Sequence, residues 1–250
     1  HAEQIKRIWK ESLGRYGVRK VWQQLKREGY VIARCTVARL MQKLGIQGVW
    51  RGKNKQTTRS RDDQKRADDL VKRNFNADHP DQLWVADFTY IQTHSGWVYT
   101  AFIIDVFSRA IVGWKVSTRM NTDMVLDALE QALHDRGMPK NVIHHSDRGV
   151  QYLSIRYTNR LEAANLRASV GTTGDSYDNA LAETVNGLYK TEVIEYLKAD
   201  WQGLADVQLA TLNWVDWFNK ERVHSALGYV SPFEFEAMYY DKINPLGQVA

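Results

Sequence analysis

Residues 84–91 read Trp-Val-Ala-Asp-Phe-Thr-Tyr-Ile, an apolar and β-branched run interrupted by one charged residue, Asp87. Aromatic and β-branched residues favour a pleated strand, and we expect a strand over Leu83–Gln92. A carboxylate with apolar strand neighbours is costly unless it is paired or bound to a metal ion. The stretch therefore predicts a buried strand that carries a candidate functional side chain.

The segments that follow alternate between strand and helix patterns. Trp97–Asp105 and Ala110–Val116 are expected to continue the first strand as an antiparallel meander. After them come, in order, a helix over Asp123–Arg136, a strand over Val142–His145, a helix over Ile155–Asn165, a strand over Arg167–Val170 and a long helix from about Asn179. This order is that of the ribonuclease-H-like fold. We therefore predict an α/β protein with a mixed five-stranded sheet and flanking helices.

The residues ahead of this region have a helical pattern and a basic composition. Residues 1–47 indicate three short helices, and the third carries Arg34, Arg39 and Lys43 beside its apolar stripe. A helix, a short turn and a basic helix are typical of a helix-turn-helix, although a plain three-helix bundle also fits. The basic residues of the next segment, which we expect to lie along a phosphate backbone, include Arg51, Lys53, Lys55 and Arg59.

Four units follow from these patterns. We expect a helical DNA-binding domain over residues 1–47, a basic linker over 48–80, a catalytic core over 81–200 and a helical extension over 201–250. Charge divides in the same way. Residues 1–61 hold 16 Lys and Arg against 3 Asp and Glu, net +13, whereas residues 62–250 hold 18 against 26, net −8. A basic front part ahead of an acidic body suggests a polyanionic partner, although a solvated basic helix pair also fits.

Composition excludes several classes of protein. Hydrophobic residues make up 44% of the 250, which excludes disorder of the whole chain. The single cysteine, Cys35, excludes a disulfide scaffold and argues against a Cys/His zinc site, and we expect it to pack within its helix. The longest strongly apolar run, Trp97 to Val106, is far shorter than the roughly 20 residues of a membrane span. No signal peptide is visible, so we expect the cytosol.

Two further carboxylates occupy positions similar to that of Asp87. Asp147 comes just after the expected strand over Val142–His145, and Glu183 lies one turn into the last helix of the core. Hard divalent ions such as Mg²⁺ take oxygen ligands, and three carboxylates brought together can hold two ions. Each carboxylate taken alone also fits a surface or capping role, so the sequence context decides.

That context resembles a known family. Asp87 in Trp-Val-Ala-Asp-Phe-Thr-Tyr-Ile, Asp147 in His-Ser-Asp-Arg-Gly-Val-Gln-Tyr and Glu183 in Asp-Asn-Ala-Leu-Ala-Glu-Thr resemble the catalytic triad of the IS-three family of bacterial insertion-sequence transposases. These belong to the DDE transposase and retroviral-integrase superfamily. The segment from Gly17 to Met41 resembles their helix-turn-helix, and residues 219–232 resemble their C-terminal signature. The resemblance covers nearly the whole chain.

The resemblance implies an enzyme that cuts and joins DNA. The triad would hold two Mg²⁺ ions, for which Mn²⁺ substitutes, and a freed 3′-hydroxyl would attack another strand, giving a circular intermediate that later integrates. The partners would be double-stranded DNA, as terminal inverted repeats and as target, and a second copy of the chain in a homodimer or higher oligomer. The chain begins at His1 rather than Met, and we expect further sequence before it, including an upstream-frame fusion partner. The expected location is the bacterial cytoplasm, at the nucleoid.

The resemblance also implies DNA contacts. Lys190 lies seven residues after Glu183, which returns it to nearly the same helix face, and family members bind terminal DNA with a basic residue there. The other positions that carry over by motif are Arg19, Lys20, Arg222 and His224, and Asn179 is added because a cap there would aim the positive end of the helix at phosphate. Asn179 also fits helix capping, and Asn219, Arg222 and His224 also fit a role in bracing the terminal helices.

Local chemistry leaves some roles open. His144 and His145 adjoin Asp147, but strand neighbours point to opposite faces, so we expect at least one to serve packing and hydrogen bonding. Asp105 is either a fourth site carboxylate or a turn residue paired with Arg109. Two other functions remain open: a ribonuclease-H-like nuclease that cuts without joining, and a non-catalytic regulator that only binds DNA.

Overall fold

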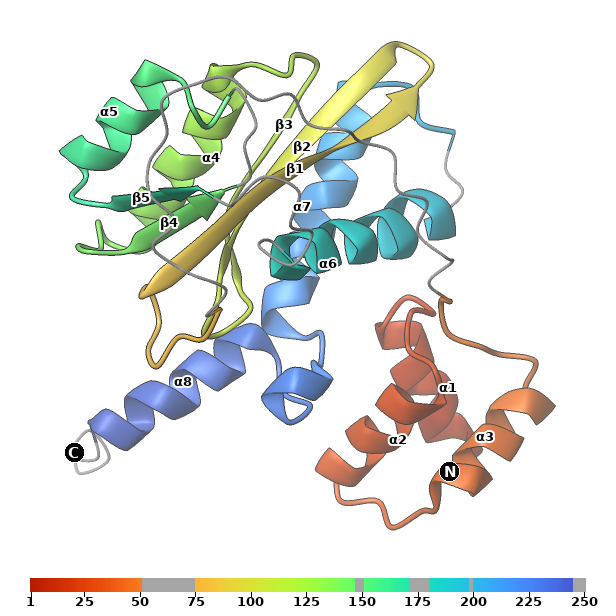
Figure 1. Ribbon diagram of the computed structural model, residues 1–250. Coiled ribbons are helices and arrows are strands. Elements are labelled where there is room, and N and C mark those ends of the chain that lie inside the picture. Colours follow the sequence, from red (N-terminus) through yellow and green to blue (C-terminus); the bar gives the residue numbers. More distant parts are fainter. Residues whose placement is uncertain (51–74, 147–150, 171–179, 198–199, 245–250) are drawn as a thin grey trace.

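The computed structural model describes residues 1–50, 75–146, 151–170, 180–197 and 200–244, and its centre is one five-stranded sheet (Figure 1). The strand order is β3-β2-β1-β4-β5. The first three strands pair antiparallel, and β1–β4 and β4–β5 pair parallel, so the sheet is mixed, as predicted. The strands are β1 (Leu83–Thr93), β2 (Gly96–Asp105), β3 (Ile111–Ser117), β4 (Ile143–Ser146) and β5 (Arg167–Val170).

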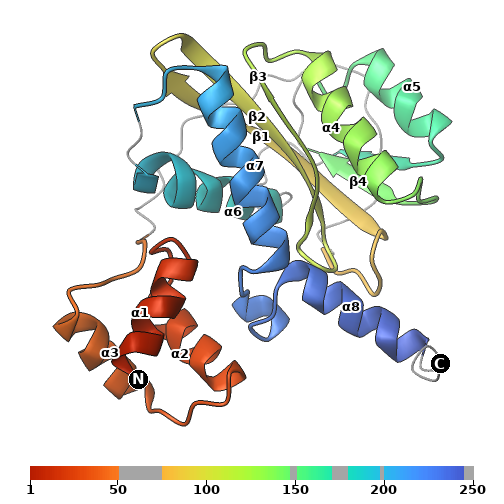
Figure 2. The same ribbon diagram turned by 180° about the vertical axis from the view of Figure 1, so that it is seen from behind.

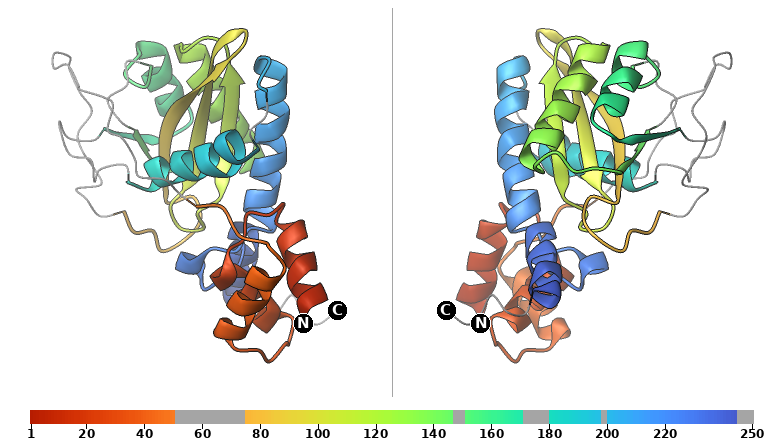
Figure 3. Two further views of the ribbon diagram at one scale, coloured as in Figure 1. Left: turned by 90° about the vertical axis from the view of Figure 1, so that its right-hand side faces the viewer. Right: turned by 90° about the vertical axis from the view of Figure 1, so that its left-hand side faces the viewer.

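Helices cover both faces of this sheet (Figures 1 and 3). On one face, α4 (Thr122–Asp135) and α5 (Ile155–Ala163) pack over a core that includes Trp84. On the other face, α6 (Ala180–Tyr189) and α7 (Leu204–Lys220) pack over a second core. The predicted order of strands and helices is confirmed, and the element boundaries agree with the expected ones to within a few residues.

Strand β1 is the central strand of the sheet, and its first four residues are buried on both faces. Trp84 and Ala86 belong to the core under α4 and α5, while Leu83 and Val85 belong to the core under α6 and α7. By this alternation Asp87 falls on the α6 side. The described pairing of β1 with β4 ends at Ala86, opposite Ser146, and the next residue, Asp87, pairs with Phe102 on β2.

Strand β3 is an edge strand held closely by α4. An ideal Cβ on Gly113 would lie 2.2 Å from the backbone oxygen of Ala128 on α4, so only glycine allows this approach. The pairing of β2 with β3 is irregular between Ile103 and Ile104, where the register shifts. This bulge and Gly113 together set how the helix sits on the edge of the sheet.

The first three helices form a separate cluster below the sheet, next to the end of α7 (Figure 2). They are α1 (Ala2–Glu11), α2 (Val18–Arg27) and α3 (Arg34–Lys43), and their shared core includes Ile8, Leu25 and Val37. The expected helical arrangement of this region is confirmed. The expected packing of Cys35 is wrong, because Cys35 lies on the outer face of α3 and is exposed.

The C-terminal half contains a capped helix and a short π-helix. The helix α8 (Pro232–Ile243) begins at Ser231 with a capping box to Glu234, which satisfies its first backbone donors. Directly after α6, Lys190–Glu195 form a π-helix, η1, that the apolar periodicity does not predict. Among the described helices, none combines the length and apolar character needed to cross a bilayer.

Candidate active site

A hydrogen bond between β1 and α6 forms the centre of the candidate site. The side-chain Nδ2 of Asn186 on α6 donates to Oδ2 of Asp87 at 2.8 Å. The other oxygen of Asp87 accepts from the backbone N–H of Phe88 at 2.8 Å. Asp87 is half-buried and Asn186 is buried, so this bond fixes the carboxylate against the helix.

Glu183 lies on the same helix, one turn before Asn186. Residues three apart on an α-helix are neighbours on one face, so Glu183 is placed beside the residue that holds Asp87. Glu183 is exposed, in the first turn of α6. The structure therefore brings two of the three predicted carboxylates to one region, where β1 faces the start of α6.

The third carboxylate, Asp147, lies outside the described residues. Ser146, the residue before it, pairs with Ala86, the residue before Asp87. In the described ranges no three His, Cys, Asp or Glu side chains gather as a metal site, and Asp147 is not part of those ranges. Other predicted site residues that lie outside them are Arg51, Lys53, Lys55, Arg59 and Asn179.

Lys190 extends the region along β1. Its Nζ lies 4.8 Å from the centre of the Tyr90 ring, three residues beyond Asp87 on the same strand. Tyr90 is 46% exposed, so the ammonium group and ring form an accessible surface. Lys190 is the first residue of η1, and the helix axis therefore continues from Glu183 to Lys190.

The predicted basic residues of the first three helices fall into two groups. Arg34, Arg39 and Lys43 are all exposed on α3. On α2, by contrast, the Arg19 guanidinium lies over the Tyr229 ring at 5.7 Å and Lys20 lies over the Tyr16 ring at 5.0 Å. Burial and the nearby Arg222 lower the pKa of Lys20 to about 7. The three α3 residues are exposed, whereas the α2 residues face the C-terminal half.

Arg222 and His224 lie in that same contact region. The Arg222 Nη2 lies 2.6 Å from Glu192 Oε1, and only 5% of Arg222 is exposed. Burial and the charge of Arg222 lower the pKa of His224 to about 2, so His224 is neutral at physiological pH. Both residues therefore fit the bracing alternative better than DNA contact.

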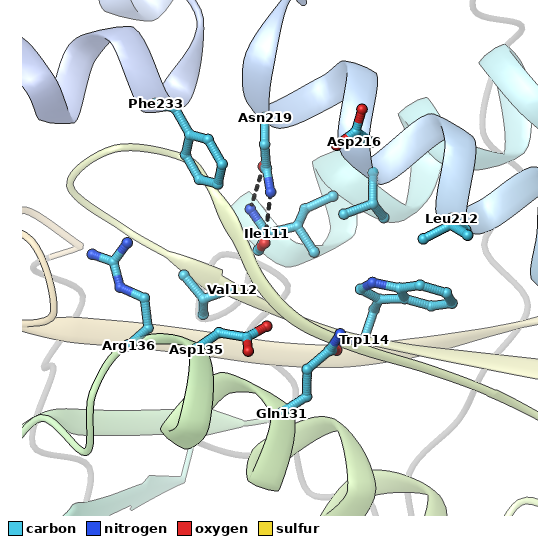
Figure 4. Close-up of a pocket in the computed structure, with 11 residues that line it drawn as sticks. Ile111, Val112, Trp114, Gln131, Asp135, Arg136, Leu212, Asp216, Asn219 and Phe233 are labelled. Carbon is cyan, nitrogen blue, oxygen red and sulfur yellow. Dashed lines mark hydrogen bonds between the residues drawn. The ribbon is translucent and has the colours of Figure 1, made fainter.

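The Asn219 side chain also braces the fold, at the other edge of the sheet. Its Oδ1 accepts from the backbone nitrogen of Ile111 at 2.9 Å and its Nδ2 donates to the backbone oxygen of Ile111 at 2.8 Å. Figure 4 shows this pair in a pocket of about 230 Å³ between β3, α4 and α7. This pocket lies along β3, two strands away from Asp87.

The histidines beside Asp147 are buried on opposite faces of β4. Nε2 of His144 lies 3.0 Å from the hydroxyl of Tyr157, and burial, with the neighbouring His145, lowers the pKa of His144 to about 4. His144 is thus neutral, and its Nε2 and the Tyr157 hydroxyl share a hydrogen bond. On the other face, Nδ1 of His145 lies 2.9 Å from the Ser169 hydroxyl. The packing and hydrogen-bonding interpretation is confirmed for His144.

Asp105 is a turn residue. Its carboxylate accepts from the backbone N–H of Asp81 at 2.8 Å and from both the backbone N–H and the hydroxyl of Ser108 at 2.8 and 2.9 Å. Asp105 pairs with Trp84, which lies three residues before Asp87 on β1. The alternative of a fourth site carboxylate is wrong, because its oxygens serve this turn.

Asn186 is not among the site residues that the sequence predicts. The available signal was its position three residues after Glu183, where an amide interrupts the otherwise apolar stretch from Val185 to Tyr189. A buried amide is costly without a partner, and the partner is a carboxylate about 100 residues earlier in the chain. Local periodicity carries no information on such a distant pairing.

Comparison with known proteins gives consistent results. The integrase core domain family matches residues 77–176 and, in a second description, residues 164–232, and the HTH-like domain family matches residues 1–54. The solved HTLV-2 integrase catalytic core domain in complex with magnesium covers 64% of this chain and 99% of its own, with a TM-score of 0.52 and 18% identity. A simian T-cell lymphotropic virus intasome chain covers 93% of this chain and 74% of its own, with a TM-score of 0.55 and 14% identity. These likenesses confirm the ribonuclease-H-like, integrase-core fold.

Relatives in sequence are much closer. The transposase for insertion sequence element IS629 of Shigella sonnei is 56% identical over 96% of this chain and 80% of its own length. The putative transposase for IS986/IS6110 of Mycobacterium tuberculosis is 52% identical over 95% and 87%. Transposase InsF for insertion sequence IS3A of Escherichia coli is 34% identical over 90% and 78%. With this identity over most of both chains, an integrase core and an N-terminal HTH-like domain, the protein belongs to the IS-three family of insertion-sequence transposases.

Proposed function

We propose that this chain is a DDE-type polynucleotidyl transferase that cleaves DNA at the ends of an insertion sequence and joins the freed ends to a second strand. Family membership supplies the reaction class. The observation that carries the assignment to this site is the hydrogen bond from Asn186 to Asp87, which ties the strand bearing one predicted carboxylate to the helix bearing another. The catalytic residues we propose are Asp87, Asp147 and Glu183.

The residues of this region fit a divalent metal centre. Carboxylate oxygens are the ligands that Mg²⁺ and Mn²⁺ prefer, and both Asp87 and Glu183 offer them at the meeting of β1 and α6. Asp147 follows Ser146, whose pairing partner Ala86 precedes Asp87. These three residues would hold two ions, which supply Lewis-acid stabilisation of the attacking and leaving oxygens when bound.

The other residues of the chain act by positioning. Asn186 donates to one oxygen of Asp87, which fixes the orientation of that carboxylate. Lys190, beside Tyr90, offers a cation to a DNA phosphate next to the reacting strand. Water would first attack a phosphodiester at the element end, break its bond to the 3′-oxygen and release a 3′-hydroxyl. That hydroxyl would then attack a phosphodiester of the second strand and displace the 3′-oxygen there, which leaves as a hydroxyl.

DNA is held mainly by the basic front part of the chain. The side chains of Arg34, Arg39 and Lys43 on α3 are all exposed, and α3 is the helix we propose as the recognition helix. We propose residues 1–47 as the DNA-binding unit, 48–80 as a linker along the phosphate backbone, 81–200 as the catalytic core and 201–250 as a helical extension. Terminal inverted repeats and target DNA are the substrates, and a dimer or larger assembly brings two ends together.

A strand-joining assay tests this function. The substrate is labelled DNA with the inverted repeats that flank the gene, incubated with Mg²⁺ and either wild type or Glu183→Gln. We expect joined products from wild type and at least a hundredfold loss in the variant. Cleavage without joining would instead identify a nuclease. Binding without chemistry in Mg²⁺ and in Mn²⁺, also with an upstream-frame fusion, would identify a regulator.

A further inference from the structure

Glu192 is a buried carboxylate that the catalytic proposal does not use. It lies in η1, the π-helix that continues α6, nine residues after Glu183. Its exposure is 6%, and both oxygens accept from Arg222, whose Nε and Nη2 lie 2.6 to 3.2 Å away. Oε2 also accepts from the indole N–H of Trp214 on α7 at 3.1 Å.

The charge of Glu192 is compensated by cations from both halves of the molecule. Burial alone would raise the pKa of Glu192, but Arg222, Lys20 and the hydrogen bond from Trp214 lower it below its ordinary value. Glu192 is therefore an anion, paired with Arg222 of the C-terminal half, and Lys20 of α2 contributes a weaker electrostatic interaction. Removing one partner of such a buried group leaves an uncompensated charge, which is costly.

The backbone of Glu192 holds the turn between α1 and α2. Nε of Arg15 in that turn donates to the backbone oxygen of Glu192 at 3.1 Å, and its guanidinium lies 4.6 Å from the Trp217 ring centre on α7. The next residue, Tyr16, accepts from the backbone N–H of Val223 at 2.8 Å and donates to the backbone oxygen of Glu221 at 3.2 Å. Arg15 and Tyr16 are both buried in this contact.

Glu192 thus contacts the α1–α2 turn through its backbone oxygen, and α7 and Arg222 through its carboxylate. The helix that holds Glu183 and Asn186 runs directly into η1, and η1 binds the α1–α2 turn of the DNA-binding helices through Glu192. A π-helix in place of α-helix puts Thr191, Glu192 and Val193 in succession into the interior. DNA bound to α3 is in this way kept at a fixed position relative to Glu183 of the same chain.

We propose that Glu192 is a positioning residue that fixes the DNA-binding helices to the catalytic helix of the same chain, so that strand transfer depends on it while DNA binding does not. The inference rests on the proposed function. On the DNA-binding side the partner of Glu192 is Arg15, which donates to its backbone oxygen. Arg222 and Trp214, both in residues 201–250, donate to its carboxylate. Arg222, which lies in the C-terminal signature, thereby has the role of holding Glu192 rather than of contacting DNA.

Paired measurements separate this role from simple stabilisation. Spin labels on the native Cys35 of α3 and at His134→Cys on α4 report the distance between the two halves, and both positions are exposed. We expect a narrow distance distribution in wild type and a broad one in Glu192→Gln and Arg15→Met. In the same variants, single-turnover joining falls at least tenfold while the Kd for inverted-repeat DNA changes less than twofold.

Two variants serve as controls. Arg15→Lys keeps a cation and a donor near the Glu192 carbonyl and is expected to restore joining and the narrow distribution. Glu234→Gln breaks the exposed ion pair with Arg27 at the rim of the same contact and is expected to match wild type. Arg15→Met remains informative if Glu192→Gln fails to fold, because it replaces a side chain at the contact by an apolar one of similar length.

Three outcomes would overturn the proposal. A broad distribution with unchanged joining shows that docking is not needed for chemistry. A narrow distribution in Arg15→Met and Glu192→Gln shows that these contacts do not fix the two halves. A wild-type chain that has a narrow distribution but joins no DNA rejects the proposed function, and with it any role of Glu192 in joining, while the docking itself stands.

Discussion

Asn186 is the residue whose removal most specifically disturbs the proposed centre. Asn186→Ala takes away the donor to Asp87 Oδ2 and leaves the carboxylates of Asp87 and Glu183 in the chain. Because partners that orient metal ligands typically contribute 10- to 100-fold, we expect the joining rate to fall by about that factor. DNA affinity should stay unchanged. Asn159→Ala, at an exposed position on α5, is the control, and equal rates for the two variants would contradict the positioning role.

His144 gives the stability of the protein a pH dependence. Its pKa is about 4 in the folded chain, because of burial first and His145 second, against 6.5 in the unfolded chain. The unfolded state therefore binds more protons between these values, and stability falls as the pH drops from about 6.5 to 4. The loss amounts to roughly 3 kcal/mol. We expect His144→Asn to lack this component in urea unfolding at pH 7 and 4.5, whereas exposed His134→Asn follows wild type.

At the scale of elements, the contact between α4 and β3 depends on Gly113. Gly113→Ala would put a Cβ 2.2 Å from the backbone oxygen of Ala128, and the helix must move because backbone cannot give way locally. Overpacking of this kind costs about 2–3 kcal/mol. Urea unfolding at pH 7 measures it, with Lys115→Ala on the same strand as a control expected to cost less than about 1 kcal/mol. A Gly113→Ala chain as stable as wild type would show that α4 is not held as described.

Elements differ in how well sequence alone predicts them. Leu83–Gln92 and Arg167–Val170 were expected as strands and are strands, because apolar runs bounded by turn residues are local signals. The π-helix over Lys190–Glu195 and the bond from Asn186 to Asp87 were not expected. Both depend on partners far along the chain, such as Arg222 for Glu192, and no local pattern carries such pairings. The site was therefore predicted as carboxylates, and its supporting contacts were not.

For the whole molecule, the separation of charge governs DNA binding. Residues 1–61 carry a net charge of +13, so affinity for inverted-repeat DNA should fall steeply with salt as phosphate counterions return. Exposed Arg39 on α3 should account for about one unit of the slope of log K against log salt. Fluorescence anisotropy measures this slope for wild type and Arg39→Ala between about 50 and 200 mM salt. Lys242→Ala on α8 should leave the slope unchanged, and an unaltered slope in Arg39→Ala would contradict the DNA contact.

We expect strand joining to require a divalent ion held by the carboxylate of Asp87, and a metal-switch assay tests this requirement most directly. Joining is measured for wild type, Asp87→Asn and Asp87→Cys, each in Mg²⁺ and in Mn²⁺. A thiolate binds Mn²⁺ better than Mg²⁺ because it is a softer ligand. We predict that both variants lose joining in Mg²⁺. Only for Asp87→Cys should the joining rate in Mn²⁺ exceed the rate in Mg²⁺ by at least tenfold. Equal loss in both metals for Asp87→Cys, or wild-type joining by Asp87→Asn, would contradict the account.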